Sequence, residues 1–282
     1  MAREIVWVMS KEQAGRRVGR ILTSDCGVSA HRYAKLKQAE AVLLDGAPAH
    51  ANVRVRCGQT LTIRLEEETA ARAETPEWAV YEDDDLLIVN KPAPLSSMRS
   101  AHQAGETLEM LVTEYLGSYR PVNRLDKGTS GLMLVAKTAY AQARAQKMLH
   151  TEDFLRAYVA VLDGCPKEMT GVIDLPIAPG EGVKRRVAAQ GKPCETFYRV
   201  MGQTLSGRTV VELRLHTGRT HQIRVHMAAI GCPVTGDYLY GAEHALLPGR
   251  FALHSAHIRL RQPVCGAVIE RFCPPPAVFF RL

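Results

Sequence analysis

Four segments of the chain combine apolar residues in the lengths that buried strands require. The run at residues 86–89 follows acidic residues and stops before Pro92, and three later runs rich in Val and Leu are of similar length. Short apolar runs bounded by polar residues predict strands with apolar neighbours on both faces. The later runs are residues 131–136, 157–162 and 208–216.

Two other segments have the spacing of helices. Residues 139–149 follow Thr138, whose hydroxyl can cap the first turn, and Ile223 and Met227 lie four residues apart ahead of Gly231. Strands and helices alternate irregularly, and the sequence has no glycine-rich nucleotide-binding loop. We therefore expect an α+β fold with a mixed, largely antiparallel sheet, flanking helices and a central cleft, and no nucleotide cofactor.

The first part of the chain predicts a separate small α+β module at residues 10–66. Its pattern indicates two helices, a hairpin that turns at Asp45 and Gly46, and a final strand of alternating polar and apolar residues. Arg32 and Lys35 would lie on the second helix. The second helix is therefore predicted to present a basic surface.

A polar stretch separates this module from the rest of the chain. Residues 67–77 have no apolar periodicity and include a Pro, which indicates a linker to a main domain at residues 78–282. The whole chain carries a formal net charge of +7. Between residues 10 and 65, ten Lys and Arg stand against four Asp and Glu. The excess favours a polyanionic partner for the module.

Neither apolar length nor cysteine spacing indicates a membrane or secreted protein. No run is long enough to cross a bilayer, and the apolar run near the N-terminus is too short for the core of a signal peptide. The seven cysteines are scattered without a C-x-x-C pair, so neither a zinc site nor a disulfide framework is indicated. We expect a cytoplasmic protein.

The densest group of polar residues is the turn at residues 123–131, which runs directly into an apolar strand. Polar groups held at the mouth of a buried strand are well placed for catalysis. On local physics alone, an Asp that stands beside Arg124 and Lys127, as Asp126 does, is more often part of a surface or structural ion pair than a catalyst.

Three stretches of the main domain resemble the RluA-type family of RNA pseudouridine synthases. NRLDKGTSGLMLVAKT is similar to the family's catalytic stretch, which reads His-Arg-Leu-Asp, two variable residues, Thr-Ser-Gly, an apolar run and Ala-Lys. LHTGRTHQIRVHMAAIGCPVTGDYLYG and FLRAYVAVLDG are similar to two further stretches. The resemblance spans about residues 78–282. It implies that Asp126 is the catalytic carboxylate, that Arg219 pairs with it and that Tyr158 is the active-site tyrosine.

The reaction that this resemblance implies explains the residue types. It breaks the N1–C1′ bond of uridine, rotates the uracil and joins C5 to C1′, without a cofactor. A carboxylate beside the ribose can attack C1′ or remove the 2′ proton, and the sequence leaves both routes open. Arg219 would keep Asp126 ionised and oriented. Tyr158 offers a face for stacking on uracil and a hydroxyl that could take the C5 proton.

The resemblance also implies residues that bind RNA. The first module is similar to the alpha-L RNA-binding motif, and Arg124 matches a family residue that fills the space left by a flipped nucleotide or else contacts phosphate. Substrate binding is predicted for Arg124, Thr129, His221, Arg224, Arg32 and Lys35, with phosphate contacts also considered at Lys184, Arg185, Arg186 and Lys192. His216, His221 and His226 are five residues apart, which does not place them on one helix face, so no metal site is predicted.

Departures from the family pattern leave alternatives open. Asn123 stands where the family usually has His, and Pro94 where a Gly is usual. A catalytically silent RNA-binding or RNA-folding protein that retains the pocket is therefore a second hypothesis. Hydrolysis of a nucleoside or glycoside is a third, weakened because only one carboxylate has motif support. The main hypothesis is a monomeric enzyme that isomerises uridine in structured ribosomal or transfer RNA.

Overall fold

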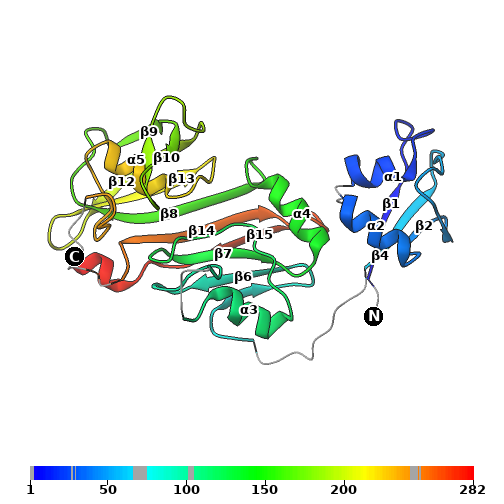
Figure 1. Ribbon diagram of the computed structural model, residues 1–282, viewed down its shortest axis with the longest axis horizontal. Helices are drawn as coiled ribbons and strands as arrows, with labels where there is room; N and C mark the ends of the chain where they lie inside the picture. Colours follow the sequence, from blue (N-terminus) through cyan, green and yellow to red (C-terminus); the bar gives the residue numbers. More distant parts are fainter. Residues whose placement is uncertain are drawn as a thin grey trace.

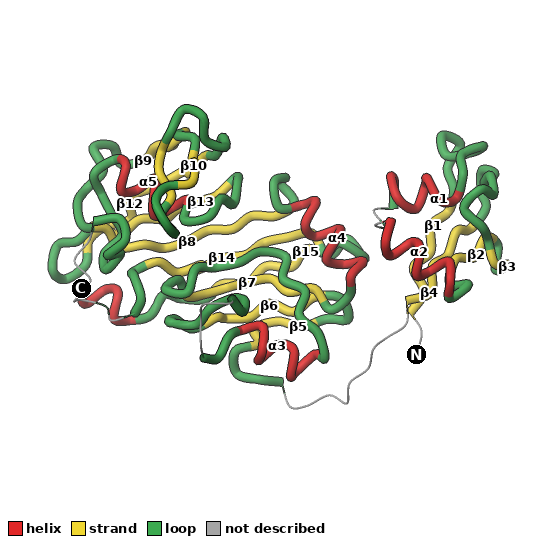
Figure 2. Tube along the Cα trace, viewed as in Figure 1, coloured by secondary structure: helices red, strands yellow, loops and turns green. Residues whose placement is uncertain are grey.

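The computed structural model describes residues 3–26, 28, 30–65, 75–100, 105–241, 247 and 249–282. A nine-stranded sheet forms the main domain (Figures 1 and 2). Along the sheet the strands are β5 (Ala79–Glu82), β6 (Leu86–Lys91), β7 (Ser130–Ala136), β14 (Leu253–Arg261), β8 (Phe154–Leu162), β13 (Thr209–Leu215), β12 (Glu195–Gln203) and β9 (Thr170–Asp174), with β15 (Val268–Phe272) also paired to β14. Among the described pairs all are antiparallel except β7 with β14. The prediction of an α+β fold with a mixed, largely antiparallel sheet is confirmed.

Strands β6 and β7, which lie nearest the predicted catalytic turn, have buried residues on both faces. The helices of the main domain are α3 (Leu108–Leu116), α4 (Ala139–Met148), α5 (Gln222–Ala229) and the 3-10 helix η3 (Ala277–Arg281). Successive residues of a strand face opposite sides. Leu87 therefore packs in the core shared with α3 and α5, whereas Leu86 packs in the core shared with α4. This double coverage explains the continuous apolar run in the sequence.

The helix ends follow the chemistry expected from the sequence. The Thr138 hydroxyl accepts a hydrogen bond from the backbone N–H of Ala141 at 3.0 Å, and α4 begins at the next residue, as predicted. Helix α5 ends shortly before Gly231, whose φ of +77° suits a glycine. None of the helices in the described ranges is long and apolar enough to cross a membrane.

A short ribbon, β10 (Ile177–Pro179) paired with β11 (Arg185–Val187), lies against α5. Ile177 and Val187 of the ribbon pack with Val225 of α5. The ribbon therefore brings the basic segment that begins at Lys184 to the same end of the sheet as α5.

The N-terminal module has its own four-stranded sheet, in the order β1-β4-β2-β3 (Figure 1). Its elements are β1 (Arg3–Val8), α1 (Val18–Arg20), the π-helical turn η1 (Ile21–Asp25), α2 (Ala30–Gln38), β2 (Val42–Leu44), β3 (Ala47–Pro48) and β4 (Thr60–Leu65). The turn at Asp45 and Gly46 is confirmed, and both residues have positive φ, as a two-residue hairpin requires.

The predicted start of this module at residue 10 is wrong, because β1 pairs along its length with β4 and belongs to the same sheet. Only long-range pairing reveals this strand. The predicted linker at residues 67–77 lies outside the described residues as far as residue 74.

The module contacts the main domain through α4. The backbone carbonyl of Cys26, at the end of η1, accepts hydrogen bonds from Arg144 Nη1 at 2.7 Å and Tyr140 Oη at 3.2 Å. Trp7 of β1 meets the edge of the Tyr140 ring, with centroids 6.4 Å apart. The Cys26 carbonyl, which has no partner within the described residues of its own helical turn, thus connects the N-terminal module to α4 of the main domain.

We expect Arg144→Met to lower the free energy of unfolding by about 1 to 3 kcal/mol, because a charge-assisted hydrogen bond between the two parts is lost. Urea unfolding followed by tryptophan fluorescence measures this, since Trp7 lies at the contact. Lys147→Met on the exposed side of α4 is the matched control and should leave stability unchanged. Equal effects of the two variants would contradict the docking contact.

Candidate active site

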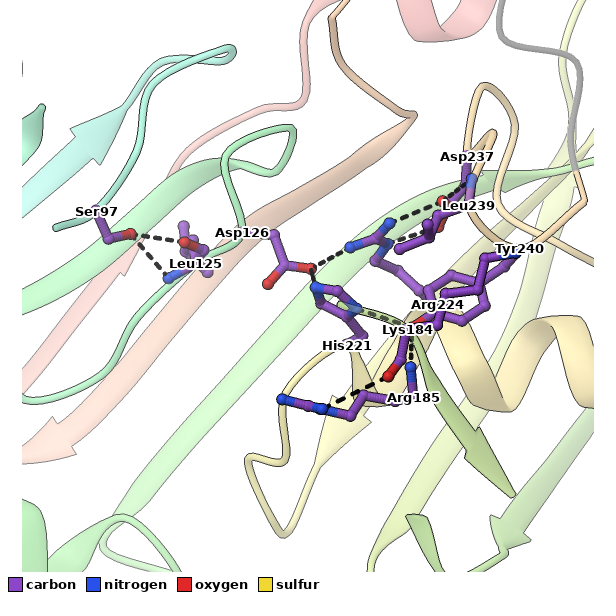
Figure 3. Close-up of polar contacts among 10 residues, drawn as sticks. All are labelled: Ser97, Leu125, Asp126, Lys184, Arg185, His221, Arg224, Asp237, Leu239 and Tyr240. Atoms are coloured by element: carbon purple, nitrogen blue, oxygen red, sulfur yellow. Dashed lines mark hydrogen bonds and ion pairs between the residues drawn. The ribbon is translucent and has the colours of Figure 1, made fainter. Parts of the chain in front are cut away.

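Asp126 lies in a tight turn immediately before β7 (Figure 3). The backbone N–H of Thr129 donates to the carbonyl of Asp126 at 3.0 Å and closes the turn. On the other side, Ser97 Oγ donates to the carbonyl of Leu125 at 2.6 Å and accepts from its N–H at 3.2 Å. The backbone on both sides of the carboxylate is therefore fixed.

A glycine lets the strand behind this turn approach its neighbour closely. A Cβ on Gly131, whose φ is +109°, would lie 2.3 Å from the backbone oxygen of Ser255 on β14. No side chain fits at that distance. The Gly of the Thr-Ser-Gly motif therefore allows β7 and β14 to pair in parallel beside Asp126.

Lys91 at the end of β6 joins the two loops around Asp126. Its fully buried ammonium donates to the carbonyl of Leu95 at 2.7 Å and of Pro92 at 3.0 Å, and lies 3.5 Å from the carbonyl of Lys127. Burial lowers the pKa of Lys91 from 10.5 to about 7, although the charge of Asp126 acts in the opposite direction. Lys91 is thus a buried amine whose hydrogen bonds tie the loops together.

The lowered pKa of Lys91 predicts a pH dependence of stability. Between pH 7 and 10.5 the unfolded chain binds a proton that folded Lys91 has released. The contribution of Lys91 to the free energy of unfolding therefore rises with pH across this window, by up to about 1.4 kcal/mol per pH unit, and is lost as pH falls through about 7. Urea titrations from pH 6 to 10 should show this slope in the wild type relative to Lys91→Met. Parallel curves for the two proteins would contradict it.

Arg224 on α5 is the ion-pair partner of Asp126. Its Nη1 donates to Asp126 Oδ2 at 2.8 Å, while Nε and Nη2 donate to the two oxygens of Asp237 at 2.6 and 2.8 Å. Asp237 is fully buried, and the ring of Phe251 lies 4.2 Å from the guanidinium carbon. The two hydrogen bonds to Asp237 fix the plane of the guanidinium so that Nη1 points at Asp126 (Figure 3).

The surroundings keep Arg224 charged. Burial by itself would lower the pKa of Arg224, but the hydrogen bond to Asp237 and the charge of Asp126 outweigh it and raise the pKa above its ordinary value. A permanent positive charge therefore faces one oxygen of the Asp126 carboxylate, whose side chain is 27% exposed.

The predicted pairing of Asp126 with Arg219 is wrong, because Arg224 takes that place, whereas the predicted contact of Arg224 with substrate stays a prediction. Arg219 is exposed and lies in the turn before α5, where its backbone N–H donates to Gln222 Oε1 at 2.9 Å. Arg224 lies five residues later, on the helix face that packs against the sheet, and its side chain is 5% exposed. Arg219 and Arg224 fall in the same stretch of family resemblance. They differ in burial, because Arg219 is exposed and Arg224 is not, and the sequence does not reveal this difference.

His221 lies beside the carboxylate. Its Nε2 is 3.7 Å from Asp126 Oδ2, and its Nδ1 is 2.8 Å from the hydroxyl of Tyr240 (Figure 3). His221 therefore belongs to the group of side chains around Asp126. The predicted contact with substrate stays a prediction.

Tyr158 on β8 is buried in the core that also contains Leu125. Burial raises the pKa of Tyr158, the charge of Arg156 partly offsets this, and the charge of Asp126 adds to it. The charge of Asp126 therefore acts on the pKa of the Tyr158 hydroxyl. Because its phenol stays protonated at neutral pH, the predicted stacking role is favoured over the predicted role as a proton acceptor.

The other predicted residues are placed differently. Arg124 is exposed, and its contact with RNA stays a prediction. Thr129 is 2% exposed and closes the Asp126 turn through its backbone N–H, and its predicted contact with substrate stays a prediction. Arg32 and Lys35 belong to α2, but their side chains are outside what the structure describes. Within its described parts, the chain has no group of three His, Cys, Asp or Glu residues that could hold a metal ion.

Sequence reasoning missed the groups that support the carboxylate: Ser97, Lys91, Asp237 and Tyr240. Asp237 and Tyr240 lie within the matched stretch GDYLYG, where an acid between apolar residues was a usable signal. Lys91 belongs to a Lys-Pro pair that is similar to the start of another family stretch, but its partners are backbone carbonyls and no role followed from the sequence. Ser97 gave no signal.

The comparisons with known proteins agree with this site. Residues 85–229 match the model of the RNA pseudouridylate synthase family. Ribosomal large subunit pseudouridine synthase D of Haemophilus influenzae is 37% identical over 79% of this chain and 75% of that protein. The protein of the same name from Escherichia coli K12 is 35% identical over 97% of this chain and 91% of its own length.

A solved structure, human RNA pseudouridylate synthase domain containing 1, is 28% identical with a TM-score of 0.58, covering 75% of this chain and 87% of that one. The fold, the matched model and the relatives that cover most of the chain agree. The chain belongs to the RNA pseudouridylate synthase family.

Proposed function

We propose that the protein isomerises uridine to pseudouridine in large-subunit ribosomal RNA and that Asp126 is its catalytic carboxylate. The observation that carries the proposal is the partly exposed carboxylate of Asp126 held through Oδ2 by a buried, permanently charged arginine. The names of the bacterial relatives support ribosomal RNA as the substrate.

In the proposed reaction the carboxylate works beside the ribose of a flipped uridine. It either attacks C1′, displacing the uracil, or removes the 2′ proton to give a glycal. The released uracil rotates and C5 bonds to C1′, which breaks the bond between Asp126 and C1′ in the first route and is accompanied by return of the proton to C2′ in the second. The C5 proton then leaves to solvent while N1 gains one. Atoms and electrons balance without a co-reactant. In both routes Arg224 orients the carboxylate through its hydrogen bond to Oδ2.

RNA binding is proposed for exposed cations around this site. Arg219 and Arg124 are exposed on either side of Asp126 in the sequence and can meet phosphates or the space left by the flipped base. The N-terminal module would add affinity through its basic surface. Transfer RNA is the alternative substrate, and a cytoplasmic location and a monomeric state complete the proposal.

The experiment is to map pseudouridines in ribosomal and transfer RNA from cells with and without this gene. The proposal expects at least one large-subunit position to lose the modification and to regain it on expression of the wild type but not of Asp126→Asn. Loss confined to transfer RNA would reassign the substrate. An unchanged map would favour a catalytically silent RNA-binding protein.

A further inference from the structure

The backbone of His221 is strained at the position nearest the carboxylate. Its φ is +59°, in the left-handed region that only a few per cent of residues other than Gly adopt, Asn, Asp and His most often among them. It stands at the N-cap of α5, but its side chain makes no capping hydrogen bond. Helix capping therefore does not account for a histidine here, and strain of this kind is characteristic of functional sites.

The hydrogen bonds of Tyr240 favour the tautomer of His221 that carries its proton on Nε2. Tyr240 Oη accepts from the backbone N–H of Arg185 on β11 at 2.9 Å. Its single proton is then free to point at His221 Nδ1, 2.8 Å away. A neutral imidazole that accepts at Nδ1 carries its proton on Nε2, and Nε2 is the atom that faces Asp126.

We propose that His221 is a positioning residue for Asp126: held neutral with its proton on Nε2, it faces Oδ2 and leaves Oδ1 as the reacting oxygen. The inference rests on the proposed role of Asp126. Oδ2 then accepts a hydrogen bond from Arg224 Nη1 at 2.8 Å and has His221 Nε2 beside it at 3.7 Å, beyond hydrogen-bond distance. Among the residues that the structure describes, Oδ1 has no hydrogen-bond partner, so it is the oxygen open to the ribose.

The charges around the ring favour its neutral form. Burial lowers the pKa of His221, and the guanidinium groups of Arg224 on its own helix and of Arg185 on β11 lower it further, whereas Asp126 and Asp237 raise it. Tyr240, the remaining titratable neighbour, stays protonated because burial raises its pKa. These are the charged and titratable groups that act on the His221 ring.

Two substitutions separate positioning from a backbone role. The amide of Gln reaches about as far as Nε2 of His, while the amide of Asn reaches only as far as Nδ1. Asn, however, tolerates the left-handed backbone better. If His221 acts through Nε2–H, His221→Gln should retain more single-turnover isomerisation than His221→Asn, which should lose roughly 10- to 100-fold. If the backbone alone matters, the order reverses, and that order would overturn the proposal.

A second measurement reads the ring without using activity. Long-range proton–nitrogen spectra of the full chain, labelled with ¹⁵N-histidine and assigned with His221→Gln, should show a neutral ring protonated at Nε2 at pH 7. Tyr240→Phe removes the donor to Nδ1 and should raise the pKa of His221 by about 0.5 to 1 pH unit. Tyr81→Phe, which loses a hydroxyl bonded to Asp83 at 2.8 Å, is the control and should not shift it.

These readouts distinguish failure of the inference from failure of the proposed function. A ring protonated at Nδ1, or a pKa unmoved by Tyr240→Phe, overturns the positioning role even in an active enzyme. The expected tautomer in a protein that fails to isomerise RNA leaves His221 placed as described and removes the function of Asp126 instead.

Discussion

Asp126→Asn is expected to bind RNA as tightly as the wild type and to lose isomerisation by roughly 10⁴-fold, the upper range for a positioned acid–base group. The amide keeps an acceptor for Arg224 but has neither the charge to attack C1′ nor the basicity to remove a proton. Single-turnover pseudouridine formation with saturating enzyme measures the loss, and a filter-binding assay measures RNA affinity.

Asp163→Asn is the matched control, because it makes the same chemical change at a carboxylate with the same 27% exposure and a 2.9 Å bond to Arg208. It lies away from the Asp126 turn and should leave the rate unchanged. A rate for Asp126→Asn close to that of the control would show that this carboxylate does no chemistry.

Arg224→Met is expected to lower the free energy of unfolding by about 3 to 5 kcal/mol, because it leaves the fully buried Asp237 without its partner. For a domain of this size each kcal/mol corresponds to about 2 to 4 °C in Tm, so the melting temperature should fall by about 10 °C. Arg224→Lys keeps the charge but cannot bond both Asp237 oxygens and Asp126 in one plane, and it should lose activity at temperatures where it remains folded.

Arg219→Met tests whether Arg224, and not Arg219, is the partner of Asp126. It makes the same change as Arg224→Met, but five residues earlier and at an exposed side chain. Its stability should stay within about 0.5 kcal/mol of the wild type, with any effect confined to RNA affinity and its salt dependence. Should Arg219→Met be the more destabilised variant, the ion pair between Arg224 and Asp126 would be assigned wrongly.

Local patterns were sufficient for most of the elements around the site. Thr138 and Gly231 marked the ends of two helices, and the apolar runs became β6, β7, β8 and β13 because those strands are covered on both faces or half-buried. Strand β1 was missed because its pairing with β4 joins residues far apart in the sequence.

The site shows the same division between local and long-range information. The matched stretches identified Asp126 and Tyr158 as candidates, but both Arg219 and Arg224 fitted the partner role by sequence. The choice depends on which side chain α5 turns toward the sheet and on Asp237, which fixes the guanidinium from beyond the helix. Lys91 and Ser97 act on backbone carbonyls, a role without a sequence signature.

The most direct measurement is tritium release from large-subunit ribosomal RNA labelled at uridine C5 and lacking the native modification, incubated with the full-length protein. Joining C5 to C1′ must expel the C5 hydrogen, so the account predicts release that rises to a fixed number of sites per RNA with wild type and is absent with Asp126→Asn. No release from a folded wild-type protein that binds the same RNA would contradict it.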